Sequence, residues 1–336
     1  MTARPPGLID RRQAIRTGLL FLAGSLAPHA RADDSTPAPS APTLTGELHV
    51  HDPSTIVQEG DTWWLFTTGT GIGTRFSTDL AHWEKGPNVF ANPPDWTASA
   101  VPKFRGYFWA PDLLRLNDTW HLYYAVSTFD SQVSAIGLAT NPTLDPNNSA
   151  YLWTDCGPVL QSAKGDPYNA IDPSLLLDDS NQLWMSFGSF WKGIMLVELD
   201  PATGLRTGPH SPIRPLAWHE SIEASYLYRH NDFYYLFVNW GLCCRGVKST
   251  YNIRVGRSRD LTGPYLDRDG ADLRHDGGTL LLDTVGTRIG PGQTGIFTAQ
   301  GREWFSYHYY DATQDGKSML GLQPLSWSND DWPQLS

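Results

Sequence analysis

Cysteine is scarce in this sequence, which holds Cys156, Cys243 and Cys244 among its 336 residues. So low a number excludes the small, disulfide-rich class of exported proteins, and the odd count leaves at least one thiol without a partner in the chain. No Cys-x-x-Cys spacing is present, so the cysteines do not predict a zinc site. The adjacent Cys243 and Cys244 have the spacing of a vicinal disulfide, but we expect two small buried residues beneath a loop.

Charged residues are also few, at 18% of the chain, and the 35 acidic residues outnumber the 25 Lys and Arg. The sequence contains no basic stripe with interleaved aromatic residues, and its net charge of −10 repels phosphate backbones and anionic lipids. The composition therefore disfavours nucleic acid and membrane surfaces as partners and favours a neutral substrate.

Helical periodicity and long apolar runs are missing as well, because Gly and Pro interrupt nearly every window. The apolar run at residues 18–24 is too short to span a bilayer. It follows paired arginines at 11–12 and precedes Ala-Arg-Ala at 30–32, which resembles a cleavage site. We therefore expect residues 1–32 to be an export signal, with the arginine pair typical of the twin-arginine route.

The composition of residues 33–43 predicts a disordered linker, and residues 44–336 form the expected folded domain. Removing the signal takes away five arginines and one aspartate, which changes the net charge from −10 to −14. We expect an exported bacterial protein, periplasmic or extracellular, that is monomeric and has no membrane partner once the signal is removed.

Aromatic residues, by contrast, are abundant, with 14 Trp, 14 Tyr and 13 Phe, and they recur in a repeated pattern. His-Asp-Pro-Ser at 51–54 and Ile-Asp-Pro-Ser at 171–174 each precede an apolar run, a polar turn and an aromatic strand. The same order recurs at Asp112, at Glu223 and, without an acid, near Gln293. Five such units predict an all-β, five-bladed β-propeller in a single domain, with the five heads at the central channel. The alternative is an ordinary β-sandwich or barrel in which the similar segments recur by chance.

If the heads meet on one axis, the carboxylates of Asp52, Asp112, Asp172 and Glu223 converge there. Clustered acids disfavour joint ionisation, which separates their pKa values as glycoside hydrolysis requires. Glu223, with its longer side chain and apolar neighbours, is the expected general acid, and Asp52 is the expected base. The alternative is that these acids cap strands or bind calcium; we assign that structural role to Asp112 alone.

His308 lies inside the fifth aromatic strand, between Tyr307 and Tyr309. A lone histidine in a strand is commonly a satisfied core residue. Because this strand borders the expected channel, a role for His308 toward a hydrated hard cation or in a proton network is an equal alternative. The spacing of the other histidines does not match that of a metal-binding site.

Longer stretches carry a family resemblance. They are Trp-Ala-Pro-Asp at 109–112, Asn-Ala-Ile-Asp-Pro-Ser at 169–174, Ile-Glu-Ala at 222–224, Asn-Trp-Gly-Leu-Cys-Cys-Arg-Gly at 239–246, Ser-Thr-Tyr-Asn-Ile at 249–253 and Tyr-His-Tyr-Tyr-Asp at 307–311, together with residues 51–54. With these motifs the sequence resembles the family 43 glycoside hydrolases, specifically the endo-α-1,5-L-arabinanases, which are five-bladed propellers. The likeness covers nearly all of the chain after the signal.

The resemblance implies an inverting hydrolase of internal α-1,5 bonds in arabinan, a side chain of pectin. It implies Asp52 as general base, Glu223 as general acid and Asp172 as the acid that raises the pKa of Glu223 and orients the substrate. His308 matches a histidine that contacts an axial ion, usually calcium, through water, and no organic cofactor is implied. Trp109, Phe129, Asn169 and His51 are the expected substrate-binding residues.

Ser225 and Gln293 depart from the family pattern, which frequently has Pro and His there, and this leaves the subsite preference open. An exo-acting α-L-arabinofuranosidase or β-xylosidase of the same family is the nearest alternative, because it would share the acids and differ in loops that close the groove. A non-catalytic sugar-binding propeller and a calcium-stabilised scaffold are the remaining alternatives.

Overall fold

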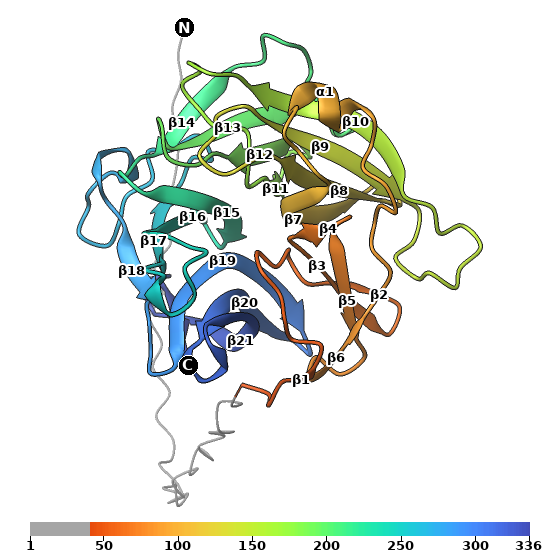
Figure 1. Ribbon diagram of the computed structural model, residues 1–336. Helices are drawn as coiled ribbons and strands as arrows, with labels where there is room; N and C mark the ends of the chain where they lie inside the picture. Colours follow the sequence, from red (N-terminus) through yellow and green to blue (C-terminus); the bar gives the residue numbers. More distant parts are fainter. Residues whose placement is uncertain (1–40) are drawn as a thin grey trace, which may run out of the picture. The chain divides into compact units, whose positions relative to one another are not determined.

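The computed structural model describes residues 41–336, so the expected export signal and most of the expected linker lie outside the described residues. Within the described range the strands form five largely antiparallel sheets of four or five strands, arranged in a ring (Figure 1). The predicted five-bladed β-propeller is therefore confirmed. No helix in this part of the chain is long and apolar enough to cross a membrane.

Each blade is built from one consecutive segment, except that one two-residue strand of blade 2 comes from within the segment of blade 1. Blade 1 contains β2 (Val57–Glu59), β3 (Thr62–Thr67), β5 (Gly73–Ser77) and β6 (His82–Lys85), with β1 (Thr45–Gly46) added parallel to β6. Blade 2 contains β7 (Tyr107–Leu116), β8 (Thr119–Val126), β9 (Ser134–Asn141) and β10 (Thr154–Ser162), with β4 (Gly69–Thr70) beside β7. Blade 3 contains β11 (Ser174–Leu177), β12 (Leu183–Phe187), β13 (Ile194–Leu199) and β14 (Ile213–Ala217).

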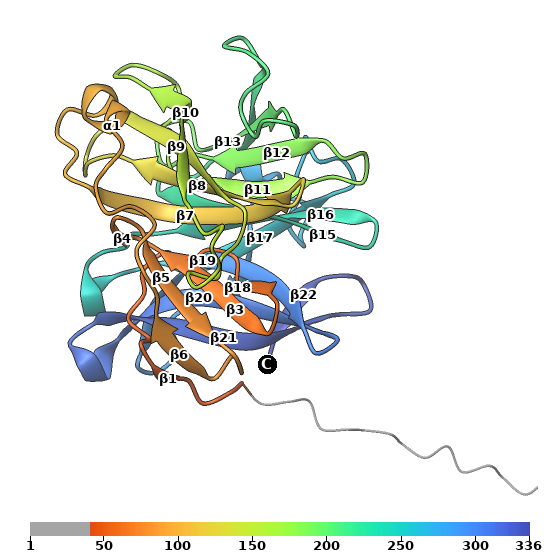
Figure 2. The ribbon, with the colours of Figure 1, turned by 90° about the vertical axis from the view of Figure 1, so that its right-hand side faces the viewer.

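Blade 4 contains β15 (Ile222–His230), β16 (Phe233–Trp240), β17 (Asn252–Ser258) and β18 (Thr279–Leu282). Blade 5 contains β19 (Arg288–Ala299), β20 (Arg302–Asp311), β21 (Lys317–Trp327) and β22 (Pro333–Leu335). The helical segments of the described range are short: α1 (Trp96–Ala100), η1 (Gly246–Lys248), η2 (Leu273–His275) and η3 (Ala312–Gln314). The side view in Figure 2 shows the blades stacked face to face around the ring.

The hydrophobic core is divided into five clusters, one at each junction between neighbouring blades. Between blades 1 and 2, for example, Phe66 packs in the same cluster as Leu122 and Tyr124, and all three are almost fully buried. These aromatic and leucine residues belong to the second strands of blades 1 and 2, which are buried on both faces and therefore read as continuous apolar runs.

The ring closes where the first described residues meet blade 5. His49 forms an isolated bridge with Met319, and the backbone N–H of Leu320 donates to the carbonyl of Leu48 at 2.9 Å. The cluster at this junction joins Trp63 of blade 1 to Trp304 of blade 5. Side chains and backbone together therefore hold the two ends of the propeller.

Every innermost strand starts or bends at a residue with left-handed backbone geometry, which non-glycine residues seldom adopt outside functional or strongly constrained sites. These residues are Asp52, Ala110, Asp172, Ala224 and Gln293, with φ between 39° and 59°. In blades 2, 4 and 5 the position coincides with an irregularity in the strand register.

This equivalence corrects one element of the predicted repeat. Ala110, two residues before Asp112, occupies the position of Asp52 and Asp172. Asp112 itself is buried, and its carboxylate accepts the backbone N–H of Thr55 at 3.1 Å and of Leu175 at 3.2 Å. It ties the inner strands of blades 1, 2 and 3 together and does not join the other acids.

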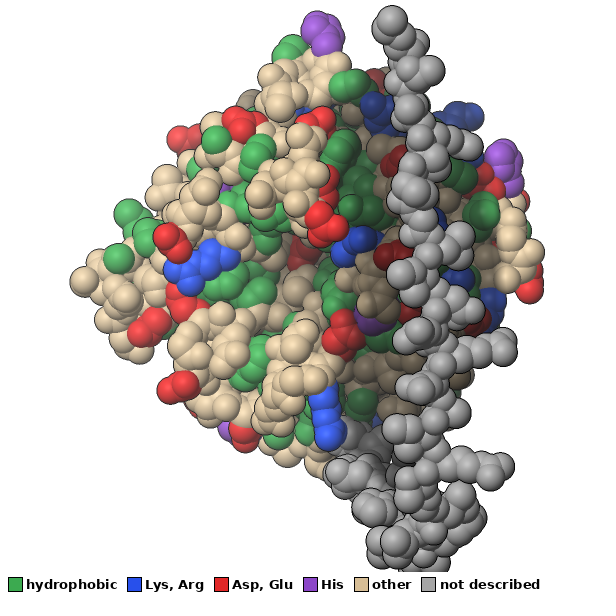
Figure 3. All heavy atoms as spheres, turned by 180° about the vertical axis from the view of Figure 1, so that it is seen from behind, with side chains coloured by type: hydrophobic (Ala, Val, Ile, Leu, Met, Phe, Trp, Pro, Cys, Tyr) green, Lys and Arg blue, Asp and Glu red, His purple; other side chains and the backbone are tan. Residues whose placement is uncertain are grey.

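The outer surface agrees with the charge analysis. On the face shown in Figure 3, acidic side chains are scattered, and the visible Lys and Arg side chains do not form an extended basic stripe.

Candidate active site

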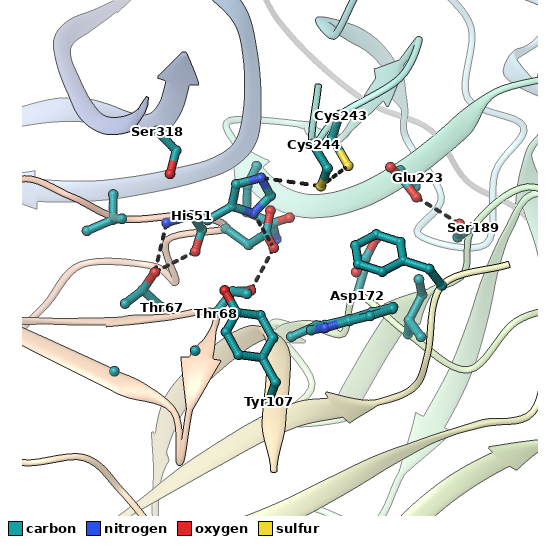
Figure 4. Close-up of a pocket in the computed structure, with 18 of the residues that line it drawn as sticks. His51, Thr67, Thr68, Tyr107, Asp172, Ser189, Glu223, Cys243, Cys244 and Ser318 are labelled. Atoms are coloured by element: carbon teal, nitrogen blue, oxygen red, sulfur yellow. Dashed lines mark hydrogen bonds and ion pairs between the residues drawn. The ribbon is translucent and has the colours of Figure 1, made fainter. Parts of the chain in front are cut away.

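A cavity of about 1260 Å³ is lined by residues from the loops and inner strands of all five blades. Asp52, Asp172 and Glu223 all line it, which brings together the three acids selected from the sequence. Figure 4 shows Glu223 and Asp172 near one another on one side of this cavity and His51, beside Asp52, on another. Asp112 is absent from the lining, and its buried carboxylate instead accepts backbone N–H groups of Thr55 and Leu175.

Asp52 follows His51 in the segment that enters blade 1, and its side chain is 16% exposed. Its Oδ2 atom accepts a hydrogen bond from the hydroxyl of Thr68 at 2.6 Å and lies 2.8 Å from Nδ1 of His51. Burial by itself raises the pKa of Asp52, but the charge and hydrogen bond of His51 outweigh it and lower the pKa to about 2. Asp52 is therefore ionised throughout the ordinary pH range.

His51 is held by contacts at both ring nitrogens. Nδ1 faces Asp52, and Nε2 lies 2.7 Å from the hydroxyl of Tyr310. Burial opposes its protonation, but the neighbouring Asp52 charge raises the pKa of His51 to about 10. The structure thus places this predicted substrate-binding residue as the partner of Asp52, at the cavity wall; its contact with substrate stays a prediction.

His308, in β20, is fully buried and stacks on His51 with ring centroids 4.2 Å apart. Its Nδ1 accepts the backbone N–H of Asp52 at 3.1 Å, whereas Nε2 is buried and has no hydrogen-bond partner among the described residues. Burial and the charge of His51 lower the pKa of His308 to about 3, so the ring is neutral. A buried nitrogen of this kind needs a water or an ion's hydration shell as its partner.

Glu223 is the second residue of β15 and faces the cavity beside a different set of groups. Its Oε2 accepts a hydrogen bond from the Ser189 hydroxyl at 2.8 Å, and its Oε1 accepts one from the hydroxyl of Tyr251. Burial raises the pKa of Glu223 above its usual value, although the two hydrogen bonds favour the charged form. The carboxyl group is therefore biased toward the protonated state that a general acid needs.

Asp172 lies at the head of β11 and accepts the backbone N–H of Ala224 at 3.0 Å. Burial raises the pKa of Asp172, and the neighbouring charges of Glu223 and Asp52 raise it further. Because two buried carboxylates so close to one another disfavour joint ionisation, Asp172 and Glu223 titrate as a pair. The arrangement makes Asp172 suitable for keeping a proton on Glu223, the role that the resemblance implies and that stays a prediction.

Aromatic rings form another part of the cavity wall. Trp109 and Phe129 lie with ring centroids 5.0 Å apart, and Phe129 is 70% exposed. Trp191, also in the lining, is 42% exposed. Asn169 reaches the cavity lining, but it is buried and its side-chain oxygen accepts the hydroxyl of Ser134 at 2.7 Å. Exposed rings at a cavity wall suit stacking against sugar faces.

The cysteine pair differs from its prediction. Cys243 and Cys244 line the cavity, with Cys244 exposed and Cys243 partly exposed, and neither is buried beneath a loop. Cys244 adopts a left-handed backbone, with φ of 61°. Cys156 is exposed, and all three cysteines are free thiols.

Comparison with known proteins assigns the family. The model of glycosyl hydrolases family 43 matches residues 41–333. The chain belongs to glycosyl hydrolase family 43. It is 39% identical to an extracellular exo-α-(1→5)-L-arabinofuranosidase of Cellvibrio japonicus, over 86% of this chain and 87% of the relative. It is 37% identical to an extracellular endo-α-(1→5)-L-arabinanase of Bacillus subtilis, over 97% of this chain and 99% of the relative.

A solved structure supports the same assignment. The α-L-arabinanase of Cellvibrio cellulosa in complex with arabinohexaose matches with a TM-score of 0.82 and 39% identity, covering 86% of this chain and 96% of that one. As a member of family 43, the protein is a glycoside hydrolase, and both the family resemblance and the enzyme class are confirmed.

Several residues at or beside the cavity of this family 43 enzyme were not selected from the sequence. Thr68, Ser189 and Tyr251 donate hydrogen bonds to the acids, and Tyr310 contacts His51. Tyr251 and Tyr310 stand in stretches that carried the resemblance, which was the available signal. Thr68 and Ser189 are small hydroxyl residues in loops, and their sequence surroundings carry no comparable signal.

Proposed function

We propose that the protein is an inverting endo-hydrolase of α-1,5-linked L-arabinan. One observation carries the assignment: two carboxyl groups in one cavity have opposite environments, since His51 lowers the pKa of Asp52 while burial raises that of Glu223. An ionised base and a protonated acid in one site are the pair that glycoside hydrolysis needs. The substrate is taken from the relatives, which are named for acting on α-1,5-linked arabinan.

In this mechanism the carboxylate of Asp52 removes a proton from a water molecule as the water oxygen attacks the anomeric carbon. The bond between that carbon and the bridging oxygen breaks, and Glu223 gives its proton to the departing oxygen. Displacement from the opposite face inverts the anomeric configuration. Asp172 contributes by disfavouring early ionisation of Glu223.

The size of the cavity supports a polymeric substrate. At about 1260 Å³ it exceeds the roughly 300–1,000 Å³ typical of a site for one small ligand. The exposed rings of Phe129 and Trp191 provide stacking positions along the wall. Several sugar units therefore fit at once, as internal cleavage requires.

The test is a time course on linear α-1,5-arabinan, with product sizes resolved by chromatography and the first-formed anomer identified by NMR. Internal cleavage predicts mixed oligosaccharides from the first minutes, with the anomeric configuration inverted. Exo action is the second candidate, favoured by the 39% identical relative that is named an exo-enzyme. Arabinose or a single short product from the start would establish it instead.

Export and an axial ion are part of the same proposal. The two relatives described above are named extracellular, which supports export through residues 1–32. The buried, unpartnered Nε2 of His308 fits the hydration shell of a cation, and His51, Asp52 and His308 group their donor atoms within 4.8 Å. A calcium ion there would supply positive charge that favours the ionised form of Asp52. We propose a monomer, without a membrane or nucleic-acid partner.

A further inference from the structure

Two adjacent thiols lie on the cavity wall in the loop between β16 and η1. Cys243 and Cys244 both line the cavity. The loop is fixed from two sides, because the N–H of Leu242 donates to the Thr250 hydroxyl at 3.0 Å and the N–H of Cys244 donates to the Tyr310 hydroxyl at 2.7 Å. The two sulfur atoms are therefore presented in a defined place, as Figure 4 shows.

An imidazole nitrogen from a distant part of the chain completes the group. Nε2 of His51 lies 3.7 Å from Sγ of Cys244, although the residues are 193 positions apart. The donor atoms of Cys243, Cys244 and His51 all lie within 4.8 Å of one another. With metal–sulfur bonds of about 2.3 Å and metal–nitrogen bonds of about 2.0–2.1 Å, tetrahedral donors are about 3.5–3.8 Å apart. The separation between His51 and Cys244 already has this value.

The pair of sulfur atoms needs one adjustment. They are 2.7 Å apart, so Sγ of Cys243 must rotate away by about 1 Å to reach the tetrahedral separation. Among the described residues, Cys244 is the one hydrogen-bond partner of that sulfur, so no other contact of this kind is broken. Rotation about a single side-chain torsion supplies the movement.

His51 is already oriented as a metal ligand. Its Nδ1 lies 2.8 Å from the Asp52 carboxylate, and a metal-ligating histidine is commonly held by a carboxylate at the ring nitrogen that does not bind the metal. A bound ion would replace the 2.7 Å contact between Nε2 and the Tyr310 hydroxyl. Tyr310 would keep its hydrogen bond from the N–H of Cys244.

We infer that Cys243, Cys244 and His51 form a binding site for a thiophilic divalent cation, Zn²⁺ or Cd²⁺, with its fourth position open to the cavity. Two thiolates and an imidazole select soft and borderline metals over calcium and magnesium, which prefer oxygen ligands. The site is thus distinct in chemistry from the ion proposed beside His308. The sequence did not predict it, because a vicinal pair and a distant histidine match no zinc-site spacing.

Occupancy of this site inhibits hydrolysis, a consequence that rests on the proposed function. The ion replaces the proton on Nε2 of His51, and the two thiolates offset its charge, so the ion holds His51 beside Asp52 without adding net charge. Inhibition therefore follows from the space that the bound ion takes in the cavity. The ion, together with the ligand that takes its fourth position, extends into the cavity at this wall.

The binding test is a cadmium titration of the reduced full-length protein without oxygen, followed by the ultraviolet sulfur-to-cadmium charge-transfer absorption. We expect one equivalent to bind in the presence of excess calcium. Cys243→Ser and Cys244→Ser should each weaken binding by more than about 100-fold. The loss of a direct ligand should exceed the roughly 10–100-fold loss of affinity that follows from changing a residue that only holds a ligand in place. Cys156→Ser is the matched control and should bind as the wild type does. No charge-transfer band in the wild type, or an unchanged band in Cys243→Ser and Cys244→Ser, would overturn the site.

The activity test compares each protein with its own metal-free rate. Zinc should lower the wild-type rate at least tenfold, a chelator should restore it, and Cys244→Ser should respond at least tenfold less to the same zinc concentration. Cadmium binding without loss of rate would overturn the inhibition while leaving the site. If arabinan is not cleaved at all, the proposed function fails, and the cadmium titration still decides the metal site.

Discussion

On the two sides of the catalytic cavity, the same left-handed backbone geometry positions carboxylates whose pKa values are shifted in opposite directions. Asp52 and Asp172 occupy equivalent kinked positions in blades 1 and 3, with φ of 46° and 54°. Asp52 faces His51, which lowers its pKa to about 2, whereas Asp172 faces Glu223 and has its pKa raised. The fold therefore sets where each carboxylate points, and the side chains beside it set its charge.

The contrast explains how one propeller presents both an acid and a base. His51 and the Thr68 hydroxyl surround the Asp52 carboxylate with hydrogen-bond donors and positive charge. The Glu223 side places a second carboxyl group nearby and relies on burial. Changing the neighbours should therefore move activity and pH dependence in directions that differ between the two sides.

Asp52→Asn should have the largest effect, because it removes the base while keeping the side-chain shape. We expect kcat on arabinan to fall by about 10²–10⁴-fold, the usual contribution of general acid–base catalysis. A substrate with a good leaving group should not restore the rate, since water activation is still missing. Circular dichroism serves as the folding control, and a near-native rate in the folded variant would refute the assigned role.

Glu223→Gln should cause a loss of similar size on arabinan but respond differently to the leaving group. An arabino-oligosaccharide with an acidic aryl leaving group needs little protonation, so its cleavage should be reduced much less than the about 10²–10⁴-fold expected for arabinan. Steady-state kinetics on both substrates measures the difference. Equal losses on the two substrates would show that Glu223 does not act as the acid.

Asp172→Asn tests the electrostatic coupling on the Glu223 side. Removing a neighbouring negative charge lowers the pKa of Glu223, so its protonated form is lost at lower pH. We expect the alkaline limb of the kcat/KM profile to move toward acid by about one pH unit, together with a lower maximum rate. An unchanged limb would assign Asp172 to substrate orientation alone.

Tyr251→Phe should move the same limb in the opposite direction by a smaller amount. The tyrosine hydroxyl donates to Glu223 and favours its charged form, so its loss raises the pKa of Glu223. The alkaline limb should then move to higher pH by less than about one unit. A shift toward acid would mean that Tyr251 supports the protonated acid in some other way.

The sequence predicted the architecture because its signal is repeated. Aromatic second strands recur five times, and burial between blades requires them, as Phe66 and Tyr124 illustrate. Asp52, Asp172 and Glu223 were found because they stand beside these strands. The hydroxyl donors Thr68 and Ser189 were missed because a loop serine or threonine has many structural roles, and only the folded chain shows which carboxylate it meets.

Contacts between distant segments could not be predicted from the sequence, for the same reason. His51 meets Cys244 across 193 positions, and the side-chain direction of the vicinal cysteines follows from a left-handed turn that cysteine seldom adopts. Asp112 was matched to the wrong position because the repeat was aligned on the acid. Aligning Pro111 with Pro53 and Pro173 would have placed Ala110 opposite Asp52.

Asp112→Asn should have the smallest effect on catalysis. It therefore serves as the control for the comparison between the Asp52 side and the Glu223 side of the cavity. The carboxylate accepts backbone N–H groups from two neighbouring blades, and an amide retains one acceptor oxygen for them. We expect the free energy of unfolding to fall by about 1–3 kcal/mol, measured by denaturant titration. The pH profile of kcat/KM should keep its shape, because Asp112 does not line the cavity. A displaced alkaline limb would show instead that this acid acts on Glu223 through the blades, and that the two sides of the cavity are less separate than their contacts indicate.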